Sequence, residues 1–329
     1  MHSARPDTRG LKEFMLEGVH NALLIYNLAS GRRRHRRFSE IEEAARLLNA
    51  AGIDAELAPT TGRGTATGIA RNAVAQNREL VIACGGDGTI NEIINGLAGS
   101  SIPMAILPAG TANILAKELG IPWDIPAAAR LIPTGTPQRI ALGAVMNATP
   151  QGDPDPSQGC RYFLCVAGAG PDGAIVHAVN PDLKDQTGIM AYWAAGARQL
   201  FQYAFPQMDI FSRESRLSAT LLVVGRTKHY GGPFQITTGA SLFEDAFEIV
   251  AFDSTSRFRY LAALPALWLG KLRKVKGIHT WKTREVTCAA ANGTTVYAQV
   301  DGEPVGTLPL HFRIVPNALT LVVPAAANK

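Results

Sequence analysis

Residues 80–97, LVIACGGDGTINEIINGL, contain the pattern that decides the fold of this chain. The apolar run from Leu80 to Cys84 predicts a buried strand, and the glycine-rich run from Gly85 to Thr89 predicts a tight turn. The apolar residues that follow recur at helical spacing and predict a helix with one apolar face: Ile90, Ile93, Ile94 and Leu97. A strand, a glycine turn and a helix in this order predict a βα unit.

The start of this predicted helix is suited to binding an anion. The N–H groups of a first helical turn have no partner within the helix and carry the positive end of its dipole. Glycines let the backbone approach a phosphate, and Thr89 adds a hydroxyl. Asp87 is unexpected there because a carboxylate repels a bare phosphate, so it indicates a metal ion or a proton transfer beside the phosphate. The turn therefore favours phosphoryl transfer; a tight turn capped by an aspartate is the simpler alternative.

A second turn of the same kind follows in residues 106–122, ILPAGTANILAKELGIP. Ile106 and Leu107 end an apolar run, Pro108–Thr111 predicts the turn, and Gly120 with Pro122 ends the helix in the expected order. Two consecutive βα turns can face one another across the carboxyl ends of neighbouring parallel strands. Open α/β sheets bind their ligands at that edge.

The pair GGDGTINE (85–92) and PAGTANILA (108–116) resembles the catalytic domain shared by diacylglycerol kinases, sphingosine and ceramide kinases and their soluble bacterial relatives. Residues 25–31, IYNLASG, resemble the first-strand turn of that family, with Leu28 where proline is usual, and residues 60–66, TTGRGTA, resemble its second turn. Residues 230–232 (YGG) resemble its glycine-rich strand, and residues 301–303 (DGE) its late Asp-Gly-Glu. The matches run from about residue 22 to residue 323.

The order of the predicted elements indicates two domains. Up to residue 141 strands alternate with helices, which predicts an α/β domain with a parallel sheet and helices on both faces. Its further strands are expected at 22–26 and 55–58, and its further helices at 38–51, 65–76 and 127–131. After a polar hairpin tip at 149–159, β-type runs predict an antiparallel β-sandwich, interrupted by helices at 188–205 and 257–272. Its strands are expected at 162–167, 218–224, 234–238, 247–252, 285–289, 295–300 and 311–315.

The resemblance also implies that the end of the chain returns to the first domain, with a strand at 319–323. The expected domains are therefore 1–141 with 318–329 returning, for the nucleotide, and 142–317, for a lipid substrate.

Composition and charge limit the classes of function. The chain has 329 residues, 47% of them apolar, and a net charge of +5, which suits an anionic nucleotide or membrane surface. No nucleic-acid-binding motif is present, and the four cysteines lack zinc-site spacing and predict reduced thiols. Residues 1–18 lack a secretory pattern, and no apolar run approaches the roughly 20 residues of a membrane span. We therefore expect a cytoplasmic protein; the sequence leaves open both peripheral membrane association and the oligomeric state.

The resemblance implies ATP as phosphoryl donor, Mg²⁺ as cofactor and a lipid alcohol, such as diacylglycerol or a sphingoid or ceramide-like lipid, as acceptor. The positions that match nucleotide-binding residues of the family are Asn27, Leu28, Ala29, Ser30, Gly31, Thr60, Gly85, Gly86, Asp87, Gly88, Thr89, Ile90, Asn91 and Thr111. A carboxylate must accept the proton of the acceptor hydroxyl. Glu303 matches the family's proton acceptor and is the expected base, whereas Asp87 is expected to organise magnesium, water and acceptor. An exchange of these two roles stays open.

One segment departs from the family pattern. Where the family has an Asp-Gly within an acidic metal-binding run, residues 241–248 are SLFEDAFE. Hard cations accept carboxylate and carbonyl oxygens, so Glu244 with the carbonyls of Ser241 and Ala246 is the candidate Mg²⁺ site, although the missing glycine changes the turn. Asp172, in residues 168–173 (GAGPDG), is expected either to contact a lipid head group or to serve as a turn residue.

Three stretches are candidates for contact with a membrane or an anion. Residues 189–205 are rich in aromatic side chains, and residues 257–276 combine aliphatic and aromatic side chains with basic ends, as an interfacial helix does. Packing of both helices on the sandwich is the alternative. The basic run GRRRHRR at 31–37 follows the first turn, where it can contact nucleotide or lipid or lie as a solvated surface.

Two other functions compete with a lipid kinase. NAD kinases and phosphofructokinases also use Gly-Gly-Asp-Gly, so a soluble substrate is possible in principle, but the second turn with Asn113 disfavours both. A non-catalytic nucleotide- or lipid-binding protein is suggested by the altered acidic segment and disfavoured by the presence of Asp87 and Glu303.

Overall fold

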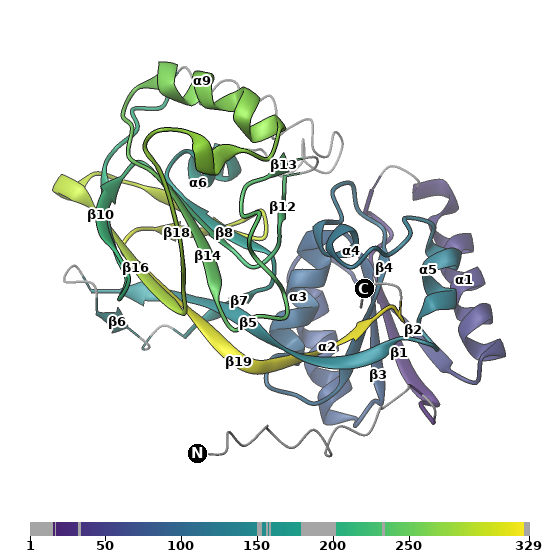
Figure 1. Ribbon diagram of the computed structural model, residues 1–329. Coiled ribbons are helices and arrows are strands. Elements are labelled where there is room, and N and C mark those ends of the chain that lie inside the picture. Colours follow the sequence, from purple (N-terminus) through teal and green to yellow (C-terminus); the bar gives the residue numbers. More distant parts are fainter. Residues whose placement is uncertain are drawn as a thin grey trace, which may run out of the picture.

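The computed structural model describes residues 16, 18–31, 34–149, 153–155, 157, 159–178, 202–231 and 234–325. The first half alternates strands and helices, as predicted (Figure 1). Its elements are β1 (Asn21–Tyr26), α1 (Arg34–Ala50), β2 (Asp54–Pro59), α2 (Thr65–Ala75), β3 (Leu80–Gly85), α3 (Asp87–Leu97), β4 (Pro103–Pro108), α4 (Ile114–Glu118) and α5 (Ile125–Leu131).

The strands of this half form a parallel sheet in the order β2-β1-β3-β4. β1 and β3 are apolar and almost wholly buried, as expected of strands covered on both faces. Helices α1 and α5 pack together on one face and α2 and α3 on the other (Figure 1). The α/β class predicted from the sequence is confirmed, and the carboxyl ends of β1, β3 and β4 meet at one edge.

The second half is built mainly of antiparallel strands. Its elements are β5 (Thr136–Ala148), β6 (Pro154–Asp155), β7 (Arg161–Phe163), β8 (Val166–Ala169), α6 (Pro171–Ala178), β9 (Met208–Phe211), β10 (Arg216–Ala219), β11 (Leu221–Gly225), β12 (His229–Tyr230), β13 (Phe234–Gln235), β14 (Phe247–Phe252), α9 (Arg257–Trp268), η2 (Leu272–Lys274), β15 (Ile278–Thr283), β16 (Glu285–Ala290), η3 (Ala291–Gly293), β17 (Tyr297–Val300), β18 (Glu303–Thr307) and β19 (Leu310–Val323).

Two sheets of this half pack face to face as a sandwich. One has the order β15-β14-β11-β8-β17-β18, and the other contains β10, β9, β16, β19 and β5. Their inner faces share a core in which Phe163 stacks on Phe247 at 5.7 Å between ring centroids and meets Phe312 edge-on. The predicted antiparallel β-sandwich is confirmed.

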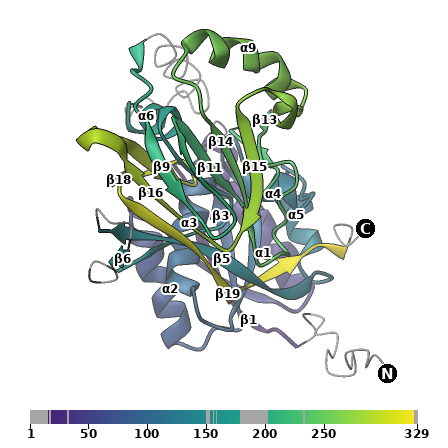
Figure 2. The same ribbon diagram turned by 60° about the vertical axis from the view of Figure 1, so that its left-hand side comes forward.

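Two long strands connect the halves (Figure 2). β19 pairs with β16 at its start and, after an irregularity between Val315 and Leu319, pairs in parallel with β4 through Thr320 and Leu321. β5 runs antiparallel to β19 along most of its length. Residues 319–323 therefore return to the first sheet as the resemblance implied, and they fix the two halves against one another.

Two predicted strands are each divided between the two sheets. The run 162–167 is split into β7 and β8, because the N–H groups of Leu164 and Cys165 donate to the Asp301 carboxylate instead of to a neighbouring strand. The run 218–224 is split into β10 and β11 at Thr220, whose N–H donates to the carbonyl of Phe252. Periodicity does not reveal such breaks, since the side chains on both sides of them remain buried.

Other boundaries also differ from the expectation. The run 234–238 is a strand only at Phe234–Gln235, and α9 ends at Trp268 because Gly270 takes a left-handed conformation (φ 63°). The helix expected at 188–205 lies largely outside the described residues. Within the part of the chain that the structure describes, no helix is both long and apolar enough to cross a membrane.

Candidate active site

The two glycine turns after β3 and β4 touch each other. A Cβ on Gly110 would lie 2.5 Å from the Cα of Gly86, a distance that no other residue could accommodate. The Asn113 side chain shapes the second turn: its Oδ1 accepts from the N–H of Gly110 at 2.8 Å, and its Nδ2 donates to the Gly110 carbonyl at 3.0 Å. The sequence prediction that these turns face one another at one sheet edge is thus borne out by their contact.

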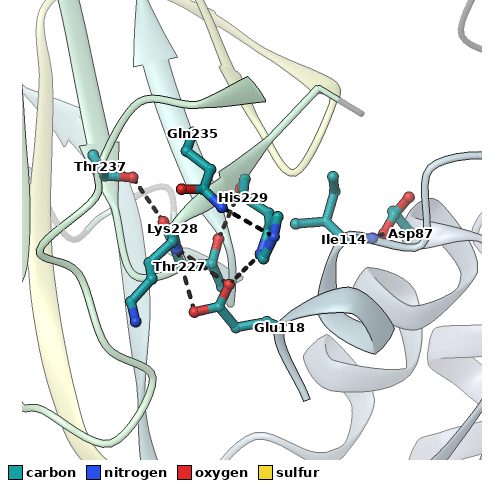
Figure 3. A network of polar contacts seen from close by, with 8 residues as sticks. All are labelled: Asp87, Ile114, Glu118, Thr227, Lys228, His229, Gln235 and Thr237. Atoms are coloured by element: carbon teal, nitrogen blue, oxygen red, sulfur yellow. Dashed lines mark hydrogen bonds and ion pairs between the residues drawn. The ribbon is translucent and has the colours of Figure 1, made fainter. Parts of the chain in front are cut away.

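Asp87 joins the two turns from the first turn of α3 (Figure 3). Its Oδ1 accepts a hydrogen bond from the N–H of Ile114, the first residue of α4, at 2.7 Å. Burial raises the pKa of the Asp87 carboxyl, and the negative charge of Asp301 adds to this effect. A partly buried carboxylate that is held by backbone N–H groups is suited to organise a cation or a proton beside a phosphate.

The turn after β1 completes the edge. Asn27 accepts from the N–H of Ala29 at 2.9 Å and donates to the Thr89 hydroxyl at 3.3 Å, so its side chain spans two turns. Arg37, on α1, is only 5% exposed and donates to the Ala109 carbonyl at 3.1 Å. One side chain of the basic run therefore connects the turn after β1 with the turn after β4. The structure does not describe residues 32 and 33.

A turn from the second half lies over the first turn of α3. The Asp301 carboxylate accepts from the N–H groups of Leu164, Cys165 and Val166, at 2.9 to 3.0 Å, and from Nδ2 of Asn91 at 2.9 Å. This fastens the β17–β18 turn to α3. Two residues on, Glu303 lies against Gly88: a Cβ on Gly88 would be 3.3 Å from Glu303 Oε1.

These groups surround one cavity of about 1410 Å³. Of the predicted nucleotide-binding residues, those that line it are Asn27, Leu28, Ala29, Ser30, Gly31, Thr60, Gly86, Asp87, Gly88, Thr89, Ile90, Asn91 and Thr111. Glu303 lines it as well. Gly85 lies beneath the turn, where a Cβ would meet Thr89 Cβ at 2.5 Å. Its role is to let Thr89 pack closely on the end of β3.

The cavity continues from the polar turns into an apolar chamber. Its walls there are formed by strands of the sandwich and by one face of α9: Leu221, Val223, Tyr230, Phe234, Ile236, Tyr260, Leu264, Leu267 and Trp268, together with Phe205. One space thus contacts both the glycine turns and a long apolar surface. The carboxylates of Asp87 and Glu303 lie among the groups at its polar end.

A second polar connection joins the halves, and no sequence pattern predicts it (Figure 3). Glu118, in the last turn of α4, lies 2.7 Å from Nδ1 of His229, and its carboxylate also accepts from the N–H of Lys228. His229 lines the cavity. Glu118 therefore holds an imidazole in the cavity wall and joins α4 to β12.

The segment predicted to bind Mg²⁺ is held in place by a buried arginine. The buried Arg226 guanidinium donates to the carbonyls of Leu242, at 2.7 Å, and Glu244, at 3.1 Å. The Glu244 carboxylate pairs with Lys282 outside the cavity lining. Burial lowers the pKa of Arg226 to about 10, so the side chain is a cation at neutral pH. Ser241, Glu244 and Ala246 lie in this turn, and a Mg²⁺ site at these three residues stays a prediction; the described residues contain no group of three or more metal-ligating side chains.

Replacement of this internal cation should destabilise the fold whether or not Mg²⁺ is present. We expect Arg226→Met to lower the free energy of unfolding by about 2–4 kcal/mol, because two buried carbonyls lose their donors. Denaturant unfolding in EDTA and in MgCl₂ checks this, with Lys282→Met as the exposed control. Recovery of the variant's stability by Mg²⁺ would show that the turn accepts a metal ion after all.

Asp172 supports the Glu303 turn and does not form a turn itself. It lies buried in α6 and accepts from Nε2 of Gln299 at 2.8 Å, and Oε1 of Gln299 accepts from the N–H of Gly302 at 2.8 Å. Burial raises the pKa of Asp172 to about 7. Because the folded pKa lies above the unfolded one, the stability that Asp172 contributes is present at low pH and is lost as the pH rises to about 7.

Asp172→Asn should remove this pH dependence. The free energy of unfolding of the variant should match that of the unmodified chain near pH 4 and exceed it at pH 8, by about 1.4 kcal/mol for each pH unit between the two pKa values. Unfolding midpoints measured from pH 4 to pH 8 test this. A stability difference that does not change with pH would disprove the raised pKa.

Two family models match this chain, one in the α/β half and one mainly in the sandwich half. Residues 21–145 match the diacylglycerol kinase catalytic domain, and residues 165–323 match the YegS C-terminal NAD kinase beta sandwich-like domain. Among curated proteins, a diacylglycerol kinase of Bacillus subtilis is 27% identical over 309 residues, covering 92% of this chain and 96% of the relative. A diacylglycerol kinase of Staphylococcus saprophyticus is also 27% identical and covers 88% of this chain and 91% of its own length.

Solved structures share the fold. The crystal structure of a diacylglycerol kinase from Bacillus anthracis str. Sterne superposes with a TM-score of 0.67 at 21% identity, covering 94% of this chain and 98% of that one. Another chain from the same organism reaches a TM-score of 0.73 and covers 98% and 99%, again at 21% identity. The arrangement of the α/β half and the sandwich half is therefore that of these structures.

Proposed function

We propose that this chain, which matches a diacylglycerol kinase catalytic domain in its first half and a YegS C-terminal domain in its second, transfers the terminal phosphoryl group of ATP to the hydroxyl of a lipid alcohol such as diacylglycerol. The observation that carries the proposal is the single cavity that contacts anion-binding turns at one end and an apolar chamber at the other. An adenosine or sugar phosphate acceptor would not need ten apolar or aromatic residues in its wall, whereas acyl chains would.

The polar end suits the triphosphate. The glycine turn at Gly86–Gly88 lines this end of the cavity together with Thr89, Gly110 and Thr111. Phosphoryl transfer asks a protein mainly to position the reactants and to neutralise charge. Mg²⁺ bound with ATP would neutralise phosphate charge, and the Asp87 carboxylate would be the group that orients it and the acceptor.

Glu303 is proposed to accept the proton of the acceptor hydroxyl. As the lipid oxygen forms its bond to the terminal phosphorus, the bond from that phosphorus to the bridging oxygen breaks, and ADP leaves with the electron pair. The O–H proton passes to the Glu303 carboxylate and from there to water. The hydrogen bonds of Asp301 to Asn91 of α3 and to the backbone of residues 164–166 hold Glu303 beside the first turn of α3.

Incubation of the pure chain with labelled ATP and lipid alcohols in mixed micelles tests the function. Diacylglycerol, sphingosine and ceramide are offered separately, with NAD and fructose 6-phosphate as soluble acceptors. We expect label in the lipid fraction. Label in NAD or the sugar instead would replace the proposal with a soluble-substrate kinase, and labelled product from none of them would favour a binding protein.

A further inference from the structure

Helix α9 has apolar side chains on its outer face as well as on its inner face. Tyr260, Ala263 and Leu267 point inward: the Tyr260 hydroxyl lies 2.9 Å from that of Thr220, Ala263 is buried and Leu267 lines the cavity. At 100° per residue, positions 258, 262, 265 and 269 form the opposite stripe. Those positions are Phe258, Ala262, Pro265 and Leu269, and all four are exposed.

The exposure of this outer stripe is high for side chains of this size. Phe258 is 75% exposed and Leu269 is 67% exposed, and the neighbouring Trp268 is 60% exposed. A helix that is apolar all round is normally buried in protein or in lipid. Both ribbon views place α9 at the extremity of the molecule, beyond the sandwich and far from the α/β half (Figures 1 and 2).

Basic side chains flank the apolar stripe at both ends. Residues 254–284 contain Arg257, Arg259, Lys271, Arg273, Lys274, Lys276, Lys282 and Arg284 and no aspartate or glutamate. Three of them pair with acidic side chains: Arg259 with Asp253, Arg273 with Glu248 and Lys282 with Glu244. Exposed Lys271, Lys274 and Lys276 follow directly after the helix. An apolar centre with basic ends complements an anionic bilayer, whose head groups are negative and whose interior is hydrocarbon.

The same helix forms the wall of the substrate chamber. Leu264, Leu267 and Trp268 line the cavity from α9, and Trp268 meets Phe234 of β13 edge-on at 5.2 Å between centroids. The outward stripe and the apolar chamber are thus separated by one helix. A bilayer in contact with Phe258 and Leu269 would bring lipid within one helix diameter of the chamber.

We propose that the outer face of α9, defined by Phe258, Ala262, Pro265 and Leu269 with the lysines 271, 274 and 276, docks on an anionic phospholipid bilayer and places the chamber at the membrane surface. This inference rests on the proposed function, because that function explains why docking would be useful. The docking itself can be tested without it. Docking involves the vesicle alone and requires neither ATP nor an acceptor lipid.

Cosedimentation with vesicles tests the docking directly. The full chain, without ATP, is mixed with vesicles of phosphatidylcholine alone and with vesicles that also contain phosphatidylglycerol. We expect binding to the anionic vesicles and about tenfold weaker binding by Phe258→Ser/Leu269→Ser, because two large apolar side chains no longer enter the interface. Lys271→Gln/Lys274→Gln/Lys276→Gln should weaken binding to anionic vesicles by about fivefold per lysine and should lessen its salt dependence.

Trp123→Ser is the matched control, since Trp123 is 51% exposed on the α/β half and should bind vesicles as the unmodified chain does. Circular dichroism and unfolding midpoints establish that each variant folds. If the Phe258/Leu269 variant does not fold, quenching of tryptophan fluorescence by brominated lipid decides: it should be smaller in Trp268→Phe and unchanged in Trp123→Phe.

The outcomes separate this inference from the proposed function. Unaltered vesicle binding by Phe258→Ser/Leu269→Ser, or equal quenching in the two tryptophan variants, overturns the docking face even if the chain is a lipid kinase. Vesicle binding that depends on α9 in a chain that phosphorylates no lipid supports the docking face and refutes the kinase. Phosphorylation of a water-soluble short-chain diacylglycerol should be the same for the double variant and the unmodified chain.

Discussion

Glu303→Gln should lower the rate of phosphoryl transfer by about 10²–10⁴-fold, the usual contribution of a positioned general base. The substitution keeps the shape of the side chain and removes its ability to accept the hydroxyl proton. The affinity for ATP should change little, because the carboxylate lies at the acceptor side of the polar turns, against Gly88. Initial rates with labelled ATP and direct nucleotide-binding measurements separate the two effects.

The control for this substitution is Glu43→Gln. Glu43 lies on α1 and pairs with Arg46 on the surface, so the same chemical change there should leave the rate unaltered. A Glu303→Gln enzyme that retains a tenth or more of the rate would remove Glu303 from the role of base. Asp87 would then be the remaining candidate.

Asp87→Asn should also reduce the rate by at least about 10²-fold, through loss of charge. An asparagine Oδ1 can still accept from the N–H of Ile114, so the two turns should stay joined. Because burial raises the pKa of the Asp87 carboxyl, the variant should be as stable as the unmodified chain at neutral pH, or more stable. Transfer rates and unfolding midpoints, measured on the same preparation, test both statements.

Asp124→Asn provides the contrast. Asp124 caps α5, where its Oδ1 accepts from the N–H of Ala127 at 2.8 Å, so the change should affect stability slightly and the transfer rate not at all. If Asp87→Asn retains its rate, or loses it only by unfolding, the carboxylate has a structural role and the assignment fails.

Local patterns in the sequence were sufficient for the first half. The apolar runs of β1 and β3 and the stripe of Ile90, Ile93 and Ile94 each depend on residues close in sequence, so periodicity predicts them. The glycine turns were predictable for the same reason. What the pattern could not supply was the contact of Gly86 with Gly110, which depends on how β3 and β4 pair.

The position of Glu303 depends on interactions between distant residues. Asn91 and Asp301 are 210 residues apart in sequence, and their hydrogen bond joins the two halves. Neither periodicity nor spacing encodes that contact. Glu303 could therefore be predicted as a site residue only from the resemblance of Asp301-Gly302-Glu303 to a family motif. Glu118 and His229 are 111 residues apart and belong to no such motif, so the sequence does not predict their contact.

Two buried arginines could not be predicted from sequence. Arginine in a basic run is normally solvated, and Arg37 gives no sign that its guanidinium reaches the Ala109 carbonyl. Arg226 stands alone between a strand and a loop, and only the fold brings it to the carbonyls of Leu242 and Glu244.

The central claim is that the two glycine turns and Glu303 enclose one triphosphate. A crystal structure with a non-hydrolysable ATP analogue and Mg²⁺ tests it most directly. We expect the triphosphate between Gly86–Thr89 and Thr111, with its terminal phosphorus turned toward Glu303 and the apolar chamber. A nucleotide bound elsewhere, or a terminal phosphate that points away from Glu303, would contradict it.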